Sequence, residues 1–299
     1  MQQQRTLIEW ALLFALVAMW GSSFMFNKLG VATVPPATLV ASRLMLGALT
    51  MLALLYARGL RLPPLGPIWV AYAALGVIGN AAPFFLITWG QQAIDSALAG
   101  ILMGVMPLAT LVLAHFLVRG ETMTASRVLG FVLGFSGIVF LMEPAAVAGV
   151  GGEALQILSQ LAILAGALCY AANSVLARLL IKTDFMLAAA GTLLVPAALM
   201  LAVALVCDRP WTLEPSFASV AAIVWLGVGP TAIATICYFR LISSAGPTFM
   251  SLVNYLSPMV AVFLGVTLLG EHPGVSAYAG LALILGGIAL SQRRRHQIA

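Results

Sequence analysis

The sequence carries little charge. Only 8% of its 299 residues are Asp, Glu, Lys or Arg, against about 25% in an average soluble domain. Hydrophobic residues make up 62% and the mean hydropathy is +1.08, which excludes an ordinary soluble globular protein. The net charge of +5 does not indicate a nucleic acid partner, because the basic residues are scattered between apolar runs rather than gathered in a patch.

Residues suited to catalysis or metal binding are also scarce. The three cysteines, Cys169, Cys207 and Cys237, form no CxxC pair and lie within or at the edge of apolar runs, which favours buried thiols over a metal or redox site. There is no H-E-x-x-H motif and no close pair of aspartates. The ATP-binding pattern G-x-x-x-x-G-K-[ST] is missing too. We therefore expect no cofactor, no metal, no ATP-driven step and no enzyme activity.

What the sequence does contain is long apolar runs. Lipid offers no hydrogen-bond partners to the backbone, so spanning segments must be helices or closed barrels, and runs of about 20 apolar residues indicate helices. The longest polar gap is about a dozen residues, which leaves no room for a soluble domain. We predict an all-α integral membrane protein with ten transmembrane helices, at about 7–28, 37–57, 67–92, 96–118, 126–143, 155–180, 185–207, 216–242, 247–269 and 274–291.

The positions of the basic residues predict the orientation of these helices. With the N-terminus in the cytoplasm, the outer side holds only Lys28 and Arg209, and Arg43 lies inside the second helix. The other basic residues then fall inside, as the positive-inside rule requires, so both termini are expected in the cytoplasm. These inner residues are Arg5, Arg58, Arg61, Arg119, Arg127, Arg178, Lys182, Arg240, Arg293, Arg294 and Arg295.

The chain repeats itself. A shift of about 150 residues lays W-G-S-S-F-M-F-N-K (20–28) over Y-A-A-N-S-V-L-A-R (170–178) and Gly120-Glu121 over Gly270-Glu271. Two five-helix copies result, 1–148 and 149–299. Because five is odd, the second copy enters the membrane from the opposite side, and such inverted repeats are typical of transporters that alternate between two similar states.

The ten helices, the five-helix duplication, the W-G-S-S-F tract and the endings V-R-G-E (118–121) and L-L-G-E (268–271) resemble the drug/metabolite transporter superfamily in its EamA branch. Within that branch the chain is most similar to YddG-type exporters of aromatic and other amino acids. The resemblance implies efflux across the bacterial inner membrane and a central cavity between helices 1, 3, 4, 6, 8 and 9, with helices 5 and 10 peripheral. One departure is Tyr170, which stands where the first copy has Trp20.

A substrate near the bilayer midplane needs polar and aromatic partners from these cavity helices. Serine and threonine hydroxyls can instead bond their own helix, and methionines can simply pack in the core. The candidate cavity residues are Trp20, Ser23, Phe24, Asn27, Asn80, Phe84, Thr88, Trp89, Gln91, Met103, Tyr170, Asn173, Thr235, Tyr238, Asn254 and Tyr255.

Prolines and charges supply further candidates. Pro83, Pro107, Pro230 and Pro258 are either static kinks or hinges, since each removes a helical hydrogen bond.

Arg43 can receive a substrate carboxylate or snorkel toward Asp95 and the headgroups. The repeat also relates an outer pair, Lys28 with Glu271, to an inner pair, Arg178 with Glu121. We treat both pairs as candidate gate contacts, with ordinary snorkelling as the alternative for the two cations.

These observations favour a secondary transporter that exports amino acids and related small metabolites by alternating access. An exchanger of phosphorylated or nucleotide sugars is the first alternative, although it would need more cavity cations than Arg43 and Lys28. An intramembrane enzyme and a channel are the others. The glycines of the fifth and tenth helices predict close packing and leave open a monomer or a weak homodimer.

Overall fold

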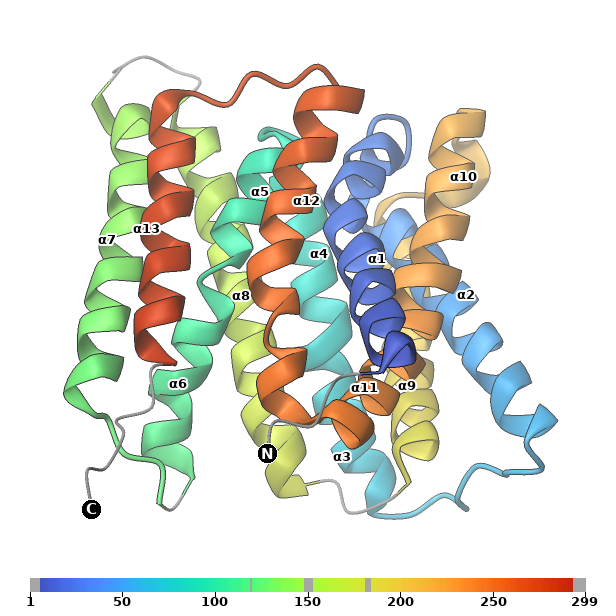
Figure 1. Ribbon diagram of the computed structural model, residues 1–299. Helices are drawn as coiled ribbons and strands as arrows, with labels where there is room; N and C mark the ends of the chain where they lie inside the picture. The colour runs from blue at the N-terminus through green and yellow to red at the C-terminus, as the bar shows by residue number, and fades with distance from the viewer. Residues whose placement is uncertain (1–5, 119, 148–152, 181–183, 293–299) are drawn as a thin grey trace.

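The computed structural model describes residues 6–118, 120–147, 153–180 and 184–292, and all regular structure in these ranges is helical (Figure 1). Eight helical segments are long and apolar enough to cross a membrane, and the apolar helices α12 (Val253–Leu268) and α13 (Val275–Ser291) are shorter. The predicted all-α membrane protein is thereby confirmed. The eight are α1 (Leu7–Val31), α2 (Pro36–Ala57), α3 to α4 (Ile68–Gly90), α5 to α6 (Ser96–Leu117), α7 (Ala125–Val147), α8 (Glu153–Leu180), α9 (Phe185–Cys207) and α10 to α11 (Phe217–Gly246).

Two ends of the bundle are distinguished by their charges. The end where α1 begins and α13 finishes carries Arg58, Arg178 and Arg240, and we call it the arginine end (Figure 1). The opposite end, the Lys28 end, carries Lys28 and Glu271. Several predictions fall outside the described residues: the boundary between the copies at 148/149, both termini, and Arg5, Arg119, Lys182, Arg293, Arg294 and Arg295.

Two spans are interrupted by a stretch of π-helix. Between α3 (Ile68–Gly76) and α4 (Ala82–Gly90) lies η1 (Val77–Ala81), and between α10 (Phe217–Leu226) and α11 (Ala234–Met250) lies η3 (Gly227–Ile233). A proline clashes with the carbonyl four residues earlier and cannot donate a bond, and a wider turn relieves both conflicts. Pro83 lies in the first turn of α4, two residues after η1 ends, and Pro230 lies within η3. Both π-segments begin at the same register of the repeat, since 77 plus 150 is 227.

Pro107 and Pro258, which the repeat aligns once one inserted residue is allowed, have different surroundings. The helix α5 (Ser96–Met103) ends just before Pro107, which sits in the first turn of α6 (Met106–Leu117). Pro258 lies inside the continuous helix α12. There the chain turns earlier, at Gly246, whose φ of 80° favours glycine. The two copies therefore bend at different places.

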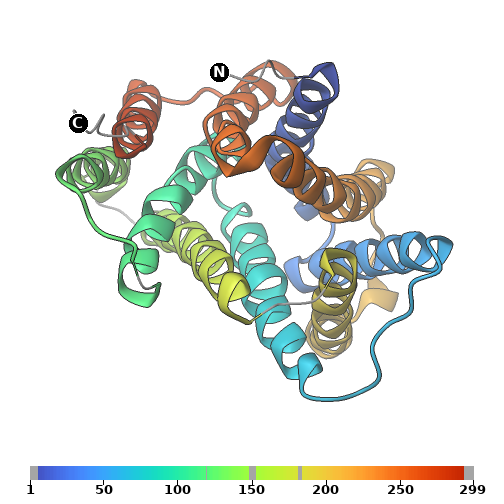
Figure 2. The same cartoon turned by 60° about the horizontal axis from the view of Figure 1, so that its bottom comes forward.

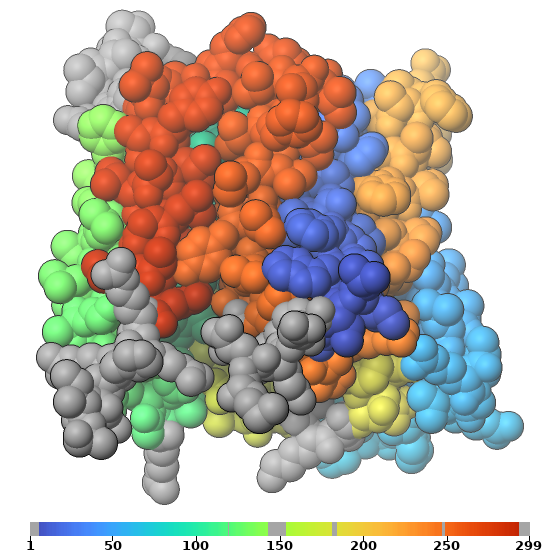
Figure 3. All heavy atoms as spheres, in the orientation of Figure 1, coloured from blue at the N-terminus to red at the C-terminus, as the bar shows by residue number. Residues whose placement is uncertain are grey.

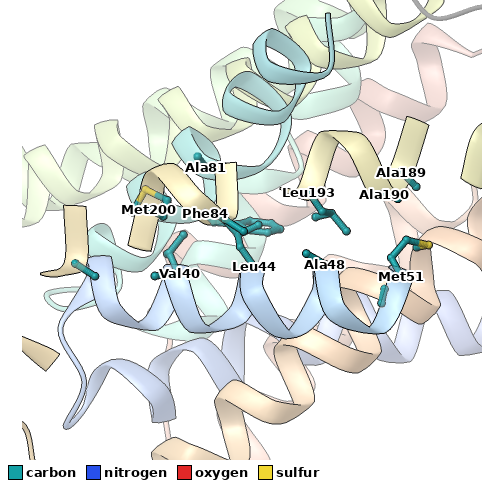
Figure 4. Close-up of a cluster of buried hydrophobic side chains, with 14 of the residues drawn as sticks. Val40, Leu44, Ala48, Met51, Ala81, Phe84, Ala189, Ala190, Leu193 and Met200 are labelled. Carbon is teal, nitrogen blue, oxygen red and sulfur yellow. The ribbon is translucent and has the colours of Figure 1, made fainter. Parts of the chain in front are cut away.

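Close helix pairs account for much of the packing. Figure 4 shows α2 laying Val40, Leu44, Ala48 and Met51 against Leu193 and other side chains of α9 and α4, and all of them are buried. In Figure 3, α13, α12 and α1 lie side by side across one face.

The helices α7 and α13 pack on each other at one side of the bundle, away from its centre (Figure 2). Their contact depends on glycine, because a Cβ at Gly130 would lie 2.5 Å from the carbonyl oxygen of Gly287. The small residues that predicted close packing are thus used within the chain.

Candidate functional site

Arg43 is a buried cation in the interior of the bundle. It lies two turns into α2 with 7% of its surface exposed. Its Nε donates to Thr231 Oγ1 at 2.9 Å, and its guanidinium carbon lies 3.7 Å from the ring centroid of Phe84. Asp95, by contrast, is exposed at the Lys28 end. Arg43 is therefore held in the interior by a hydroxyl and an aromatic face, and a desolvated cation–π contact of this kind contributes about 2 kcal/mol.

Thr231 connects Arg43 to a π-segment. It lies within η3; its hydroxyl accepts from Arg43 and donates at 2.7 Å to the carbonyl of Leu226, the residue before η3. Thr231 is not among the residues predicted from the sequence. The only signal was its position directly after Pro230, where a kinked helix leaves backbone groups without their usual partners.

Aromatic side chains from four spans surround this region. Trp20 of α1 donates its Nε1 hydrogen to the carbonyl of Pro230 at 3.3 Å and lies 5.8 Å, centroid to centroid, from Tyr238 of α11. Phe84 of α4 meets Tyr170 of α8 edge to face at 6.3 Å. Phe84 is buried, whereas the other three are half-buried. Trp20 and Tyr170, which the repeat relates, thus belong to one aromatic region together with Arg43.

The remaining cavity candidates either interact with helix backbone or lie half-buried among the helices. Asn80 lies within η1 and Asn173 of α8 packs against it: Asn80 Nδ2 donates to the carbonyl of Thr192 at 3.2 Å, and the Asn173 amide packs on Gly79. Ser23 and Thr235 donate to their own helices, as the alternative interpretation of hydroxyls expects. The half-buried residues Phe24, Met103 and Tyr255 pack against a buried apolar cluster, and Trp89 and Asn254 are also half-buried.

Asn27, Thr88 and Gln91 form a closed hydrogen-bonded cluster near the Lys28 end. Asn27 Nδ2 donates to Gln91 Oε1 at 2.7 Å, and Thr88 donates to Asn27 Oδ1 at 2.9 Å. Gln91 Nε2 reaches the carbonyl of Phe24 at 2.9 Å. All three side chains are at most 2% exposed. Because their polar groups satisfy each other, they join α1 to α4 in this conformation, and a role in contacting substrate stays a prediction.

Lys28 and Glu271 hold opposite sides of the turn between α4 and α5. Lys28 Nζ donates to the carbonyls of Gln91 at 2.9 Å and Ile94 at 2.7 Å. The buried Glu271 carboxylate accepts from the backbone amides of Ser96 at 2.7 Å and Ala97 at 2.9 Å, which caps α5 from a distant part of the chain. The structure therefore links the two charges through this turn rather than by a direct ion pair.

At the arginine end the matching charges do meet. Arg178 Nη1 lies 3.8 Å from Glu121 Oε1, and Arg127 Nη1 lies 3.3 Å from Glu121 Oε2. The Arg178 side chain is 64% exposed, so this contact is worth at most about 1 kcal/mol. Whether either pair acts as a gate stays a prediction.

Apolar spans with kinks at matching register, around a buried cation and half-buried aromatic residues, are the features of a multi-pass membrane protein. The chain belongs to the EamA-like transporter family, whose model matches residues 8–143 and 157–292. The predicted membership of the EamA branch is confirmed, as is the absence of enzyme function.

Relatives cover nearly the whole chain. An "Uncharacterized inner membrane transporter YedA" from Escherichia coli strain K12 is 27% identical over 93% of this chain and 88% of its own length. A "Probable terminal-alkyne amino-acid exporter" from Streptantibioticus cattleyicolor is 28% identical over 95% of this chain and 93% of its own. A solved crystal structure with 24% identity has a TM-score of 0.67 and covers 94% of this chain and 95% of that chain, which supports the fold. Together with the membrane-spanning helices, these findings confirm the predicted multi-pass location in the inner membrane.

Proposed function

We propose that this protein is a secondary transporter that exports amino acids, aromatic ones included, and related small metabolites by alternating access. In this proposal the copies 1–148 and 149–299 are inverted five-helix repeats, and both termini lie in the cytoplasm. The observation that carries it is the pair of π-helical segments at matching register, η1 and η3, which give each copy a deformable turn; one of them, η3, bonds Arg43 through Thr231. The two separate matches to the family model support the same division.

The substrate class rests on the chemistry around Arg43. A single buried guanidinium suits one carboxylate, and the rings of Trp20, Phe84, Tyr170 and Tyr238 suit an apolar or aromatic side chain. A phosphorylated sugar carries more negative charge, and among the described residues Arg43 is the one buried cation. A relative named as an amino-acid exporter adds support.

The bonding at the Lys28 end suggests which side is closed. The Asn27 cluster and the Lys28 bonds tie α1 to α4 and to the turn before α5, and the Glu271 cap ties the loop after α12 to α5. At the arginine end the contact of Arg178 with Glu121 is long and exposed. This conformation is then closed toward the outside, and export requires these bonds at the Lys28 end to break.

Counterflow in proteoliposomes tests the proposal. Vesicles preloaded with an unlabelled aromatic amino acid should take up the labelled one faster than empty vesicles, with saturation, because a carrier exchanges bound substrate. Glucose 6-phosphate in the same assay represents the exchanger alternative. Counterflow with the sugar phosphate alone, or a flux that never saturates, would replace the proposal by an exchanger or a channel. No counterflow with any amino acid would refute amino-acid transport.

A further inference from the structure

A cavity of about 400 Å³ opens at the arginine end, among α2, α9 and α11. Its apolar walls are Phe185, Ile236, Phe239 and Ile242, and its two cationic residues are Arg58 and Arg240. None of the predicted substrate-cavity residues lines it. It is therefore a different site from the region around Arg43, and we call it the Arg58–Arg240 site.

The arginines of this site are available for a ligand. Both are exposed, and among the described residues neither forms an ion pair. Arg58 Nη1 contacts Met186 Sδ at 3.2 Å, which directs its side chain toward α9. Asp184, the acidic residue next to Phe185, already accepts from the amide of Met186 at 2.8 Å as the N-cap of α9. An acidic group brought by a ligand would thus find two guanidinium groups without a carboxylate partner.

The apolar walls restrict what that ligand is. Phe185 of α9 and Phe239 of α11 lie with ring centroids 5.1 Å apart, and Ile236 and Ile242 extend the apolar surface along α11. A free inorganic anion gains nothing from these four side chains, whereas a molecule with an acidic head and a hydrocarbon tail uses both parts of the site.

The position of the cavity matches the headgroup level of the membrane. Arg58 is the C-cap of α2, at the end of a spanning helix, where arginines reach headgroup phosphates. Basic pockets between helices on the cytoplasmic side are suited to anionic lipid headgroups. We propose that the Arg58–Arg240 site binds an anionic phospholipid of the cytoplasmic leaflet, with its phosphate at the arginines and its acyl chain over Phe239 and Ile242. Only the assignment of the leaflet rests on the proposed function.

Native mass spectrometry of the purified full chain tests this with phosphatidylglycerol and phosphatidylcholine of the same acyl chains. We expect the protein to bind phosphatidylglycerol roughly tenfold more tightly, because its headgroup brings a net negative charge to the two arginines, whereas the choline cation neutralises the phosphate of phosphatidylcholine. The double variant Arg58→Gln, Arg240→Gln should lose this preference. Arg61→Gln is the matched control, because Arg61 is exposed near Arg58 but does not line the cavity. Equal binding of the two lipids, or equal losses in the control, would overturn the proposal.

A second arm separates a lipid from a soluble anion. Glycerol 3-phosphate shares the headgroup chemistry but has no acyl chain, so it should not displace phosphatidylglycerol at equal concentration, and Phe239→Ser should weaken lipid binding. Displacement by glycerol 3-phosphate with no effect of Phe239→Ser would instead show a soluble-anion site and refute the lipid. Lipid binding is measured without transport, so failure of this proposal can be distinguished from failure of the counterflow test of the proposed function.

Discussion

At the scale of single residues, the polar side chains of this membrane protein are defined by their partners. Arg43 bonds Thr231 and faces Phe84, Lys28 bonds two carbonyls, and Glu271 caps α5. Each of these contacts joins spans far apart in the sequence. In an apolar environment an unpaired polar group is costly. The effect of a substitution at one of these positions on transport or stability should therefore follow from the contact that is lost.

Substituting Arg43 should raise the KM of substrates that carry a carboxylate more than the KM of substrates that lack one. A hydrogen bond to a charged group contributes about 1.5–3 kcal/mol, so Arg43→Gln should raise the KM for an amino acid by roughly 10- to 100-fold. The amide of the same amino acid has no carboxylate and should be little affected. Counterflow with both compounds measures the difference, and an equal rise in KM for the two would remove Arg43 as the carboxylate partner.

Removing the charge of Glu271 should destabilise the protein. Glu271→Gln keeps one acceptor oxygen but turns a donor toward an amide of Ser96 or Ala97, which loses a charge-assisted bond worth about 1.5–3 kcal/mol. Thermal unfolding in detergent should show a lower midpoint. Glu214→Gln is the control, because Glu214 is an exposed acid of the loop before α10. Equal midpoints for the two variants would contradict the capping role.

At the scale of elements, the positions of the kinks follow from the prolines, but the local backbone geometry differs from one proline to another. Pro83 and Pro230 are associated with π-helical turns at matching positions. Pro107 follows a break in its helix, whereas Pro258 lies in a continuous one. If Pro107 and Pro258 are hinges, a single conformation of the protein should hold them in two different local geometries, and this difference is observed.

Replacing the matched prolines should slow the conformational change. Pro107→Ala and Pro258→Ala restore a helical hydrogen-bond donor and stiffen the bend. We expect the counterflow rate to fall several-fold while the binding affinity for the amino acid changes less. Pro196→Ala serves as control, since Pro196 lies inside α9 and has no proline partner in the other copy. Unchanged rates in both hinge variants would leave these prolines as static kinks.

The contact of α7 with α13 should tolerate no side chain at Gly287. A Cβ there would lie 2.5 Å from the carbonyl oxygen of Gly130, and such overpacking costs about 1–3 kcal/mol. Gly287→Ala should therefore lower the thermal midpoint in detergent. At the adjacent Gly286 the nearest atom would be Leu133 Cδ2 at 3.6 Å, an ordinary contact. Gly286→Ala should be neutral or slightly stabilising, and the same loss in both would refute the packing argument.

At the scale of the whole molecule, the charge difference between the two ends predicts the sidedness in the membrane. The exposed Cys207 lies where α9 finishes at the Lys28 end, and Gly66 is exposed in the loop before α3 at the arginine end. In intact cells an impermeant maleimide should label Cys207 in a variant without the other cysteines. A cysteine at Gly66 in a cysteine-free chain should react only after permeabilisation. Labelling of both from one side would contradict the proposed orientation.

The class of the protein followed from the sequence alone. Low charge, long apolar runs and the repeat of 20–28 at 170–178 are properties of local composition and order, so they predict an all-α membrane transporter without any contact being known. The W-G-S-S-F tract and the Gly-Glu endings carry the resemblance to the EamA branch, which the family match confirms. The sites of the kinks were also readable, because a proline perturbs its own helix wherever that helix packs.

Only the tertiary structure decided the partners of the polar groups. The repeat suggested that Lys28 meets Glu271, yet packing brings the turn at 91–97 between them, and each bonds its backbone. Arg43 turns to Thr231 and Phe84 rather than toward Asp95. The physical reason is the short range of a hydrogen bond, about 3 Å. Which groups come that close inside lipid depends on how distant helices pack, and no local pattern of residues contains that information.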